Sequence, residues 1–287
     1  MNTLGATKLH TKSKKKKGLA GLDTAIILIA FIITASVLAY VAVSMGIFVT
    51  QKAKTTINKG QETASTALSL AGNILYATNY PTDTESFWLY LPIAPSAGVS
   101  SVQLAPATTS ISLTASTENI VLSNIYNYTL LTITNSPYLQ SLTAGSQTYY
   151  YYSSPYTALL ALGYTTTSYK AVANKDVFQV QSGACSSTTP GLSGANYFTF
   201  NVSKTQYCAE VYHTFAFTFP VAGDSLVGSS IAPAGSVVGV MILFGPAEGH
   251  IVFQYQTITI QVQPNIGSPL TVAQYVYQPD GTVTVLG

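Results

Sequence analysis

The residue types that most often carry enzyme chemistry are few in this 287-residue chain and are widely spaced. Its three histidines, His10, His213 and His250, are isolated from one another along the sequence. The two later ones lie in strand-like segments, where a surface or hydrogen-bonded histidine is more typical than a ligand. The sequence contains no phosphate loop, dinucleotide fingerprint, zinc-ligand spacing or nucleophile motif. We therefore predict no catalytic, cofactor-binding or metal-binding residue and no enzymatic activity.

One short segment does have the residue types that a processing enzyme recognises. Lys14–Lys17 precede the small residue Gly18, and after Leu19 the run Thr24–Thr50 contains no charged residue. A secretory signal peptide places its apolar region before the cleavage site and loses it on cleavage. Here a cut after Gly18 leaves the apolar run on the mature chain. This order predicts a class III, type IV pilin-like signal peptide over residues 1–18.

The distribution of charge supports removal of that leader. All 12 basic residues are lysines, six of them at or before Lys17, whereas the 10 acidic residues begin at Asp23. The whole chain carries +2, but from Leu19 onward six lysines face ten acids, a net charge of −4. Because no second basic cluster exists, we expect no nucleic-acid partner. By the positive-inside rule, the lysines hold the N-terminus in the cytoplasm while the remainder is exported.

Export makes two kinds of covalent modification relevant. Cys185 and Cys208 are the only cysteines, and in an exported domain such a pair more often forms a disulfide than a metal site. Asn-Tyr-Thr at Asn127 and Asn-Val-Ser at Asn201 are acceptor sequons, so both asparagines are glycosylation candidates. The run Tyr149–Tyr152 could stack on sugars, but alternating core and surface positions of one strand explain it better.

The element that must position these N-terminal residues is a long helix. Residues 19–78 contain no proline and are mostly helix formers, which predicts one helix of about 90 Å. Its first half is apolar on every face, as in a membrane span or the centre of a helix bundle. Its second half is amphipathic, and a bundle requires such a continuation whereas a simple anchor does not. We expect assembly through Ile27, Phe31, Leu38 and Val41.

The remaining residues, 79–287, are expected to form one β-domain. A turn cluster at Asn79–Asp83 ends the helix. Runs rich in Val, Ile, Thr, Tyr and Phe then follow, separated by Pro, Gly and Ser. The fold class that we predict is α+β: one long N-terminal hydrophobic helix followed by an all-β, immunoglobulin-like sandwich of two sheets. A helical pattern is recognisable only around Thr157–Gly163.

One expected strand, Ile251–Val262, has a visible irregularity. Its apolar residues fall at odd positions up to Tyr255 and at even positions from Ile258. Side chains alternate strictly along a regular strand, so the inward face must change phase between these two residues. The sequence therefore predicts a β-bulge at this point.

Both ends of the chain resemble archaeal flagellins (archaellins) of the crenarchaeal type. At the N-terminus the resemblance lies in Gly18-Leu19-Ala20-Gly21 with the following Leu22–Phe31, and in Phe48–Ile57. At the C-terminus it lies in Gly239–Pro246 and Phe253–Ile260. The middle, roughly residues 131–205, matches less clearly, which indicates insertions there.

This resemblance implies a function. A prepilin-type signal peptidase would remove residues 1–18, and the subunits, held in the cytoplasmic membrane before assembly, would stack their helices (residues 19–78) into a filament core without a channel. The β-domains would form an extracellular sheath, and a motor on a membrane platform would turn this helical homopolymer for swimming. Two alternatives remain, an adhesive archaeal type IV pilin subunit and a membrane-anchored surface β-domain protein that never polymerises. The C-terminal resemblance favours the first function over the pilin.

Asp23 is the only charged residue between Lys17 and Lys52, and related type IV pilins carry an acidic residue at the same position after the cut. A carboxylate in an apolar helix is costly to bury unless it is paired. Its partner is either the positive end of its own helix dipole or the α-amino group that cleavage creates at Leu19. Two interpretations follow: a helix-end charge that faces solvent or headgroups, or a pair that sets the register between subunits and makes assembly depend on processing.

Overall fold

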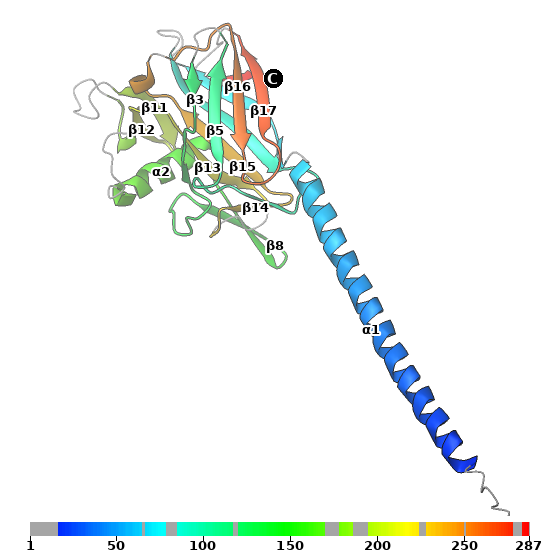
Figure 1. Ribbon diagram of the computed structural model, residues 1–287. Coiled ribbons are helices and arrows are strands. Elements are labelled where there is room, and N and C mark those ends of the chain that lie inside the picture. The colour runs from blue at the N-terminus through cyan, green and yellow to red at the C-terminus, as the bar shows by residue number, and fades with distance from the viewer. Residues whose placement is uncertain are drawn as a thin grey trace, which may run out of the picture. The chain divides into compact units, whose positions relative to one another are not determined.

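The computed structural model describes residues 17–64, 67–78, 85–116, 120–169, 178–185, 195–223, 228–249, 251–277 and 283–286 (Figure 1). The chain divides into two compact units, Met1–Lys59 and Gly60–Gly287. Helix α1 (Lys17–Ala64) makes up the described part of the first unit and continues into the second. All the strands that the structure describes belong to the second unit, the β-domain.

Helix α1 is shorter than the sequence predicts. It has 48 residues, a length of about 72 Å, and the expected continuation to Thr78 is wrong. Strands β1 (Leu68–Leu70) and β2 (Ile74–Thr78) occupy that segment. Both strands pair with β3 (Ser86–Pro95), and Leu68 and Ile74 are buried in the sandwich core. Pairing with β3 and burial in the core therefore decide the structure of this segment. Its apolar spacing alone does not, since a short apolar run is compatible with a helix or with a strand.

The β-domain is built around a seven-stranded sheet. Its strand order is β18-β2-β3-β15-β13-β7, with β1 also paired to β3. β3 has eight buried residues in succession, and β15 has six, so both faces of the sheet are covered and the alternation of apolar and polar residues disappears. Besides β1, β2 and β3, this sheet contains β7 (Tyr126–Thr129), β13 (Phe215–Ala222), β15 (Val237–Leu243) and β18 (Val283–Leu286).

A four-stranded sheet packs on one face of the central sheet. Its order is β17-β16-β5-β6, and its strands are β5 (Ser110–Ala115), β6 (Val121–Leu122), β16 (Gln256–Gln263) and β17 (Leu270–Val276). Leu89, Leu91 and Ile93 of β3 share one core with Leu113 of β5 and Ile260 of β16. These two sheets confirm the predicted sandwich that follows a long N-terminal apolar helix.

The opposite face of the central sheet carries a third layer. The sequence indicated its helix, around Thr157–Gly163, but not the layer itself. It consists of α2 (Pro155–Tyr169) and a three-stranded sheet, β10-β12-β11. Those strands are β10 (Phe178–Ser182), β11 (Asn196–Val202) and β12 (Thr205–Val211). Phe215, Phe217 and Phe219 of β13 belong to this second core together with Trp88 and Leu159. In Figure 1, α2, β11 and β12 gather away from β5, β16 and β17.

The expected bulge near Tyr255 is wrong. Strand β16 begins only at Gln256, and its pairing with β17 is regular from there. Tyr255 lies in a turn with φ 60°, and the amide of Gln256 donates to the carbonyl of Phe253 at 3.1 Å. The phase of the apolar face changes because the preceding residues belong to a loop whose side chains, including Phe253, also enter the core.

Candidate assembly site

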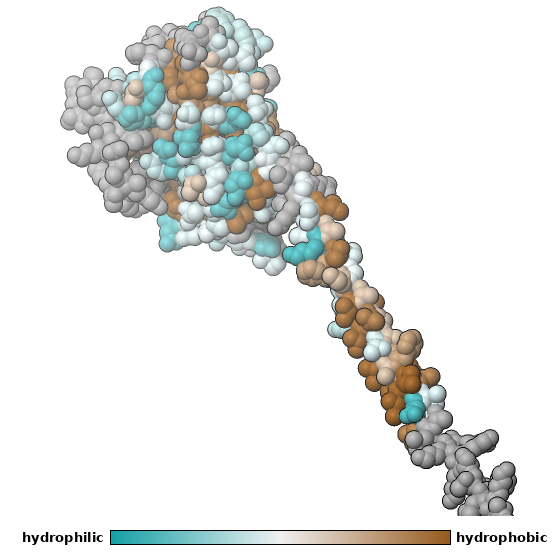
Figure 2. All heavy atoms as spheres, viewed as in Figure 1, coloured by the Kyte–Doolittle hydropathy of each residue, from teal (hydrophilic) through white to brown (hydrophobic). Residues whose placement is uncertain are grey.

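The surface of α1 is the most unusual feature of the molecule. Every residue from 21 to 58 whose exposure is described is exposed, and the side chains are mainly large and apolar, as Figure 2 shows. Phe31, for example, is 72% exposed. The span Gly21–Asn58 has a mean hydropathy of 2.8 at its most apolar window. It is therefore long and apolar enough to cross a membrane or to pack inside a bundle.

Several hydroxyl groups on α1 are satisfied within the helix itself. Thr34 donates to the carbonyl of Ala30 at 2.9 Å, and Thr50 donates to the carbonyl of Gly46 at 2.7 Å. Ser36 bonds Ile32 in the same manner. Such bonds satisfy the side chain within its own helix. These hydroxyls therefore add little cost when the helix is placed in lipid or among other apolar helices.

The residues expected to assemble share one stripe of this helix. At about 100° per residue, Asp23, Ile27, Phe31, Leu38 and Val41 fall within a sector of roughly 80°. All five are exposed. Burying the four apolar side chains is worth roughly 6–12 kcal/mol before the cost of association. The carboxylate of Asp23 stands at the head of the stripe, so a partner that covers Phe31 also comes near the acid.

The expected cleavage point lies at the start of α1. The helix begins at Lys17, so the backbone of Gly18 and Leu19 is already helical. The rest of the leader, residues 1–16 with His10, lies outside the described residues. Leu19 stands four residues before Asp23, a spacing that brings two positions of a helix to the same face. A new α-amino group at Leu19 would lie at the N-terminal end of the helix, about one turn before the carboxylate of Asp23.

The two cysteines are joined in the β-domain. The sulfur atoms of Cys185 and Cys208 are 1.98 Å apart, which is a disulfide, and their Cα atoms are 4.9 Å apart. Cys208 lies in β12, and Cys185 follows β10, the strand that pairs with β12. The amide of Cys185 also donates to Thr199 Oγ1 of β11 at 3.4 Å. The bond therefore ties together the sheet of the third layer.

Both candidate glycosylation residues have exposed side chains at the margins of sheets. Asn127 is exposed on β7, the last strand of the central sheet, and Asn201 is exposed on β11, the last strand of the three-stranded sheet. The sequon hydroxyl of Thr129 accepts a bond from Thr218 Oγ1 at 2.9 Å. A glycan at either site would extend into solvent without disturbing the core.

His213 has a partner that is distant in sequence. Its Nδ1 lies 2.9 Å from Oε1 of Glu248, and Glu248 Oε2 accepts the amide hydrogen of Thr214 at 2.8 Å. Glu248 thus ties the turn before β13 to the 3-10 helix Pro246–Glu248. No local sequence signal predicts this pair. His250 lies outside the described residues.

A projecting hairpin is the other feature that the sequence missed. β8 (Gln140–Ala144) and β9 (Gln147–Tyr151) pair with each other, and Gly145 between them has φ 67°. The strand-like run Thr148–Tyr152 is visible in the sequence, but its partner strand is not. Tyr149–Tyr151 are all partly exposed and only Tyr152 is buried, so the expected alternation of core and surface is wrong. The glycine-containing turn was the available signal.

Comparison with known proteins places these features in context. A family model described as archaeal-type flagellin matches residues 18–274. Flagellin FlaB2 of Saccharolobus shibatae is 58% identical over 298 aligned residues, which cover 98% of each chain. Probable flagellin 2 of Archaeoglobus fulgidus is 36% identical over 121 residues, 40% of this chain and 56% of its own length.

Two solved structures are also similar. The archaeal flagellum of Methanospirillum hungatei is 16% identical, with a TM-score of 0.39, and covers 93% of this chain and 99% of its own. Flagellin FlaB1 of Methanocaldococcus jannaschii is 14% identical, with a TM-score of 0.40, and covers 76% of this chain and 95% of its own.

Proposed function

The chain belongs to the archaeal-type flagellin family, and from this premise we propose that it is a structural subunit of the archaellum filament used for swimming. The observation that carries the proposal is the exposed apolar surface of α1. Such a surface is stable only in lipid or against similar helices. Copies of the same helix supply that environment, so the subunits polymerise through α1.

Assembly would begin from a precursor in the cytoplasmic membrane. A prepilin-type signal peptidase would cut between Gly18 and Leu19, which removes the lysine-rich leader and keeps the apolar span. The order of charge, small residue and apolar run supports this step. The mature helix then exchanges lipid for neighbouring helices, and the archaellum motor and its membrane platform act on the growing filament.

The β-domain would form the extracellular outer layer of the filament. The bond between Cys185 and Cys208 supports an oxidising, extracellular location. Asn127 and Asn201 are exposed and would carry glycans there. The charge-poor surface, with 8% charged residues in the whole chain, changes little in net charge as the external pH falls, which suits an acidic medium.

Asp23 would pair with the new α-amino group of Leu19, on the same subunit or on a neighbouring one. The position of Asp23 at the head of the apolar stripe supports this, because assembly would bury the carboxylate together with Phe31. A buried carboxylate requires a partner. Since the amino group exists only after cleavage, unprocessed chains would lack that partner and would not assemble in register.

Deletion and complementation test this function. Cells without the gene should lose surface filaments and swimming, and the wild-type gene should restore both. Leu38→Glu should leave the chain synthesised but absent from filaments, because a charge on the apolar stripe opposes helix packing. Tyr277→Glu, a matched change at an exposed residue of the β-domain, should preserve filaments. Deleted cells that retain their filaments and swim normally would refute the function.

A further inference from the structure

The β8–β9 hairpin forms a sheet of its own, and its strand β9 lies beside β13 of the central sheet. Within the described residues its two strands pair only with each other. Its base is fixed to the domain, since the amide of Tyr152 donates to the carbonyl of Pro220 at 3.0 Å. Figure 1 shows the β8 end extending from the domain. A two-stranded hairpin is marginally stable in water, and within the described residues the outer edge of β8 has no partner strand. Contact of β8 with another surface would therefore stabilise the hairpin.

The side chains of the hairpin are those of a contact surface. Leu142 lies directly opposite Tyr149 and is 59% exposed. No charged residue occurs between Glu118 and Lys170, so both strands are uncharged. Solvent-facing edge strands usually carry charges that prevent pairing, whereas interfaces are rich in tyrosine and poor in charge. The hairpin has the composition of an interface although nothing in the subunit covers Leu142.

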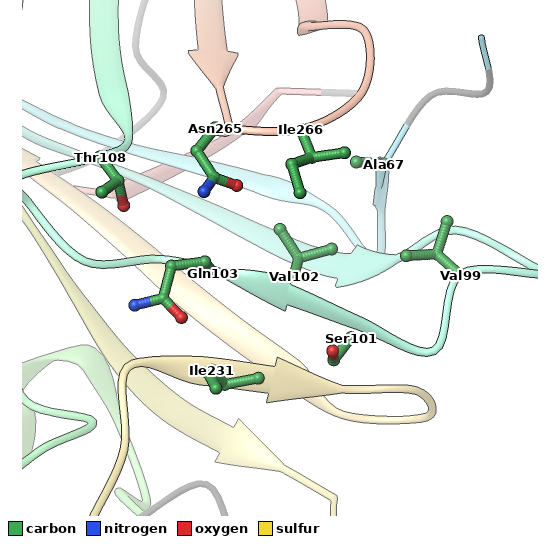
Figure 3. A pocket seen from close by; sticks show the side chains of 9 residues that line it. All are labelled: Ala67, Val99, Ser101, Val102, Gln103, Thr108, Ile231, Asn265 and Ile266. Carbon is green, nitrogen blue, oxygen red and sulfur yellow. The ribbon is translucent and has the colours of Figure 1, made fainter. Parts of the chain in front are cut away.

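The same domain has a pocket of matching chemistry. A cavity of about 330 Å³ opens between β4 (Ser101–Gln103), β14 (Ile231–Pro233) and the loop after β16 (Figure 3). Val102 and Ile231 line it together with Gln103, Asn265 and Ile266, and Ile266 is 51% exposed. The lining has apolar, hydroxyl and amide groups but no charged residue. The volume lies at the small end of ligand pockets, a size suited to one or two large side chains.

We propose that the hairpin is an arm that inserts Leu142 and Tyr149 into this pocket on a neighbouring copy of the chain. The proposal rests on the filament function and names the contact between β-domains. The arm of one copy enters the pocket of the next, and that copy offers its own arm to a third, so the contact is heterologous. Heterologous contacts that do not close into a ring generate open helical polymers. Uncharged side chains of the arm meet an uncharged pocket, whose lining combines apolar side chains with hydroxyl and amide groups. The contact links the outer layer independently of α1.

Charge substitution on the two faces of β8 gives a matched test. Leu142→Asp places a carboxylate on the inserted face. Thr143→Asp places the same charge on the opposite face of the same strand, where Thr143 lies opposite Thr148. Gene-deleted cells carrying Leu142→Asp should show a loss of long filaments, or filaments that break under shear that leaves the wild type intact. Thr143→Asp filaments should resemble the wild type. Equal filament length and shear resistance in both variants would overturn the proposal.

Cross-linking identifies the partner directly. Filaments with Leu142→Cys and Ile266→Cys should give a ladder of dimers, trimers and larger products with a short bifunctional maleimide. Filaments with Leu142→Cys and Gln261→Cys, an exposed position of β16 outside the pocket, should remain monomeric on denaturation. Monomers from both variants would overturn the arm contact, and glycan binding lost in Leu142→Asp would then assign the hairpin to sugars. Absence of this chain from wild-type filaments would instead refute the proposed function.

Discussion

Removal of the disulfide should lower the stability of the β-domain by an amount that can be calculated from the structure. Cys185 and Cys208 are 23 residues apart, and closing a loop of that length in the unfolded chain is worth about 3 kcal/mol. Replacing both cysteines by alanine removes this constraint and a small buried volume at Cys208. The three-stranded sheet that the bond ties together contributes Phe198 and Phe200 to the second core. We expect the β-domain to lose about 3 kcal/mol of its free energy of unfolding.

Thermal unfolding of the full chain, purified in mild detergent and followed by circular dichroism, measures this loss. For a domain of about 200 residues, 3 kcal/mol corresponds to a fall in Tm of roughly 6–12 °C. Reduction of the wild-type chain before heating should lower its Tm to that of the double alanine variant, while the reductant should leave the variant unchanged. This comparison separates the cross-link from any effect of the substituted side chains.

Two results would refute the reasoning. Labelling of two free thiols in unreduced, denatured filament protein would show that the bond does not form. An equal Tm for oxidised and reduced wild-type protein would show that the bond forms but does not constrain the unfolded chain.

Four further predictions follow from the same features. A bulky residue at Gly18 should block processing, and N-terminal sequencing of filament protein that gave a start other than residue 19 would contradict the cut site. Asp23→Asn should leave the leader cleaved and the β-domain folded but give few or no filaments; electron microscopy showing filaments of normal spacing would leave the acid only a local helix-end role. Glycans at Asn127 and Asn201 should raise the subunit mass above that of the polypeptide, and a double Asn→Gln variant should lose the excess; equal masses would exclude glycosylation. Burial raises the pKa of Tyr126 to about 12, against about 10 unfolded, so stability should hold below about pH 10 and fall between pH 10 and 12 as the unfolded chain alone loses protons; a thermal unfolding series over that range that showed no loss would contradict it.

The predictable parts of this protein are those encoded by local patterns. The apolar run after Gly18 specifies a long N-terminal helix, because hydropathy is a property of neighbouring residues. The absence of charged residues from Thr24 to Thr50 likewise specifies an apolar helix surface that is exposed in the single chain. The β-rich composition after residue 85 was sufficient for the fold class, since strand propensity and turn residues alternate over short distances.

The end of α1 could not be located in the same way. Leu68 and Leu75 fit the spacing of an amphipathic helix. In the structure Leu68 lies in β1 and Leu75 in β2, and both strands pair with β3. The choice between helix and strand depends on contacts with Pro95 and Tyr90. Those partners lie beyond the window over which periodicity is judged.

The third layer and the small polar site show the same limit. Phe215, Phe217 and Phe219 alternate with residues that face the other core, so the strand is apolar on both faces, but only the fold reveals that α2 covers one of them. His213 and Glu248 are 35 residues apart and carry no pattern that joins them. Pairings between distant residues of this kind follow from topology, which a single sequence does not contain.

A high-resolution electron cryomicroscopy map of native filaments tests the central claim most directly. The account predicts that this chain builds the filament, that its first residue is Leu19, and that α1 packs around the axis with Phe31 and Leu38 buried among neighbouring helices while the β-domains lie outside. A filament core made by another protein, or copies of this chain found only in the membrane with α1 surrounded by lipid, would contradict it.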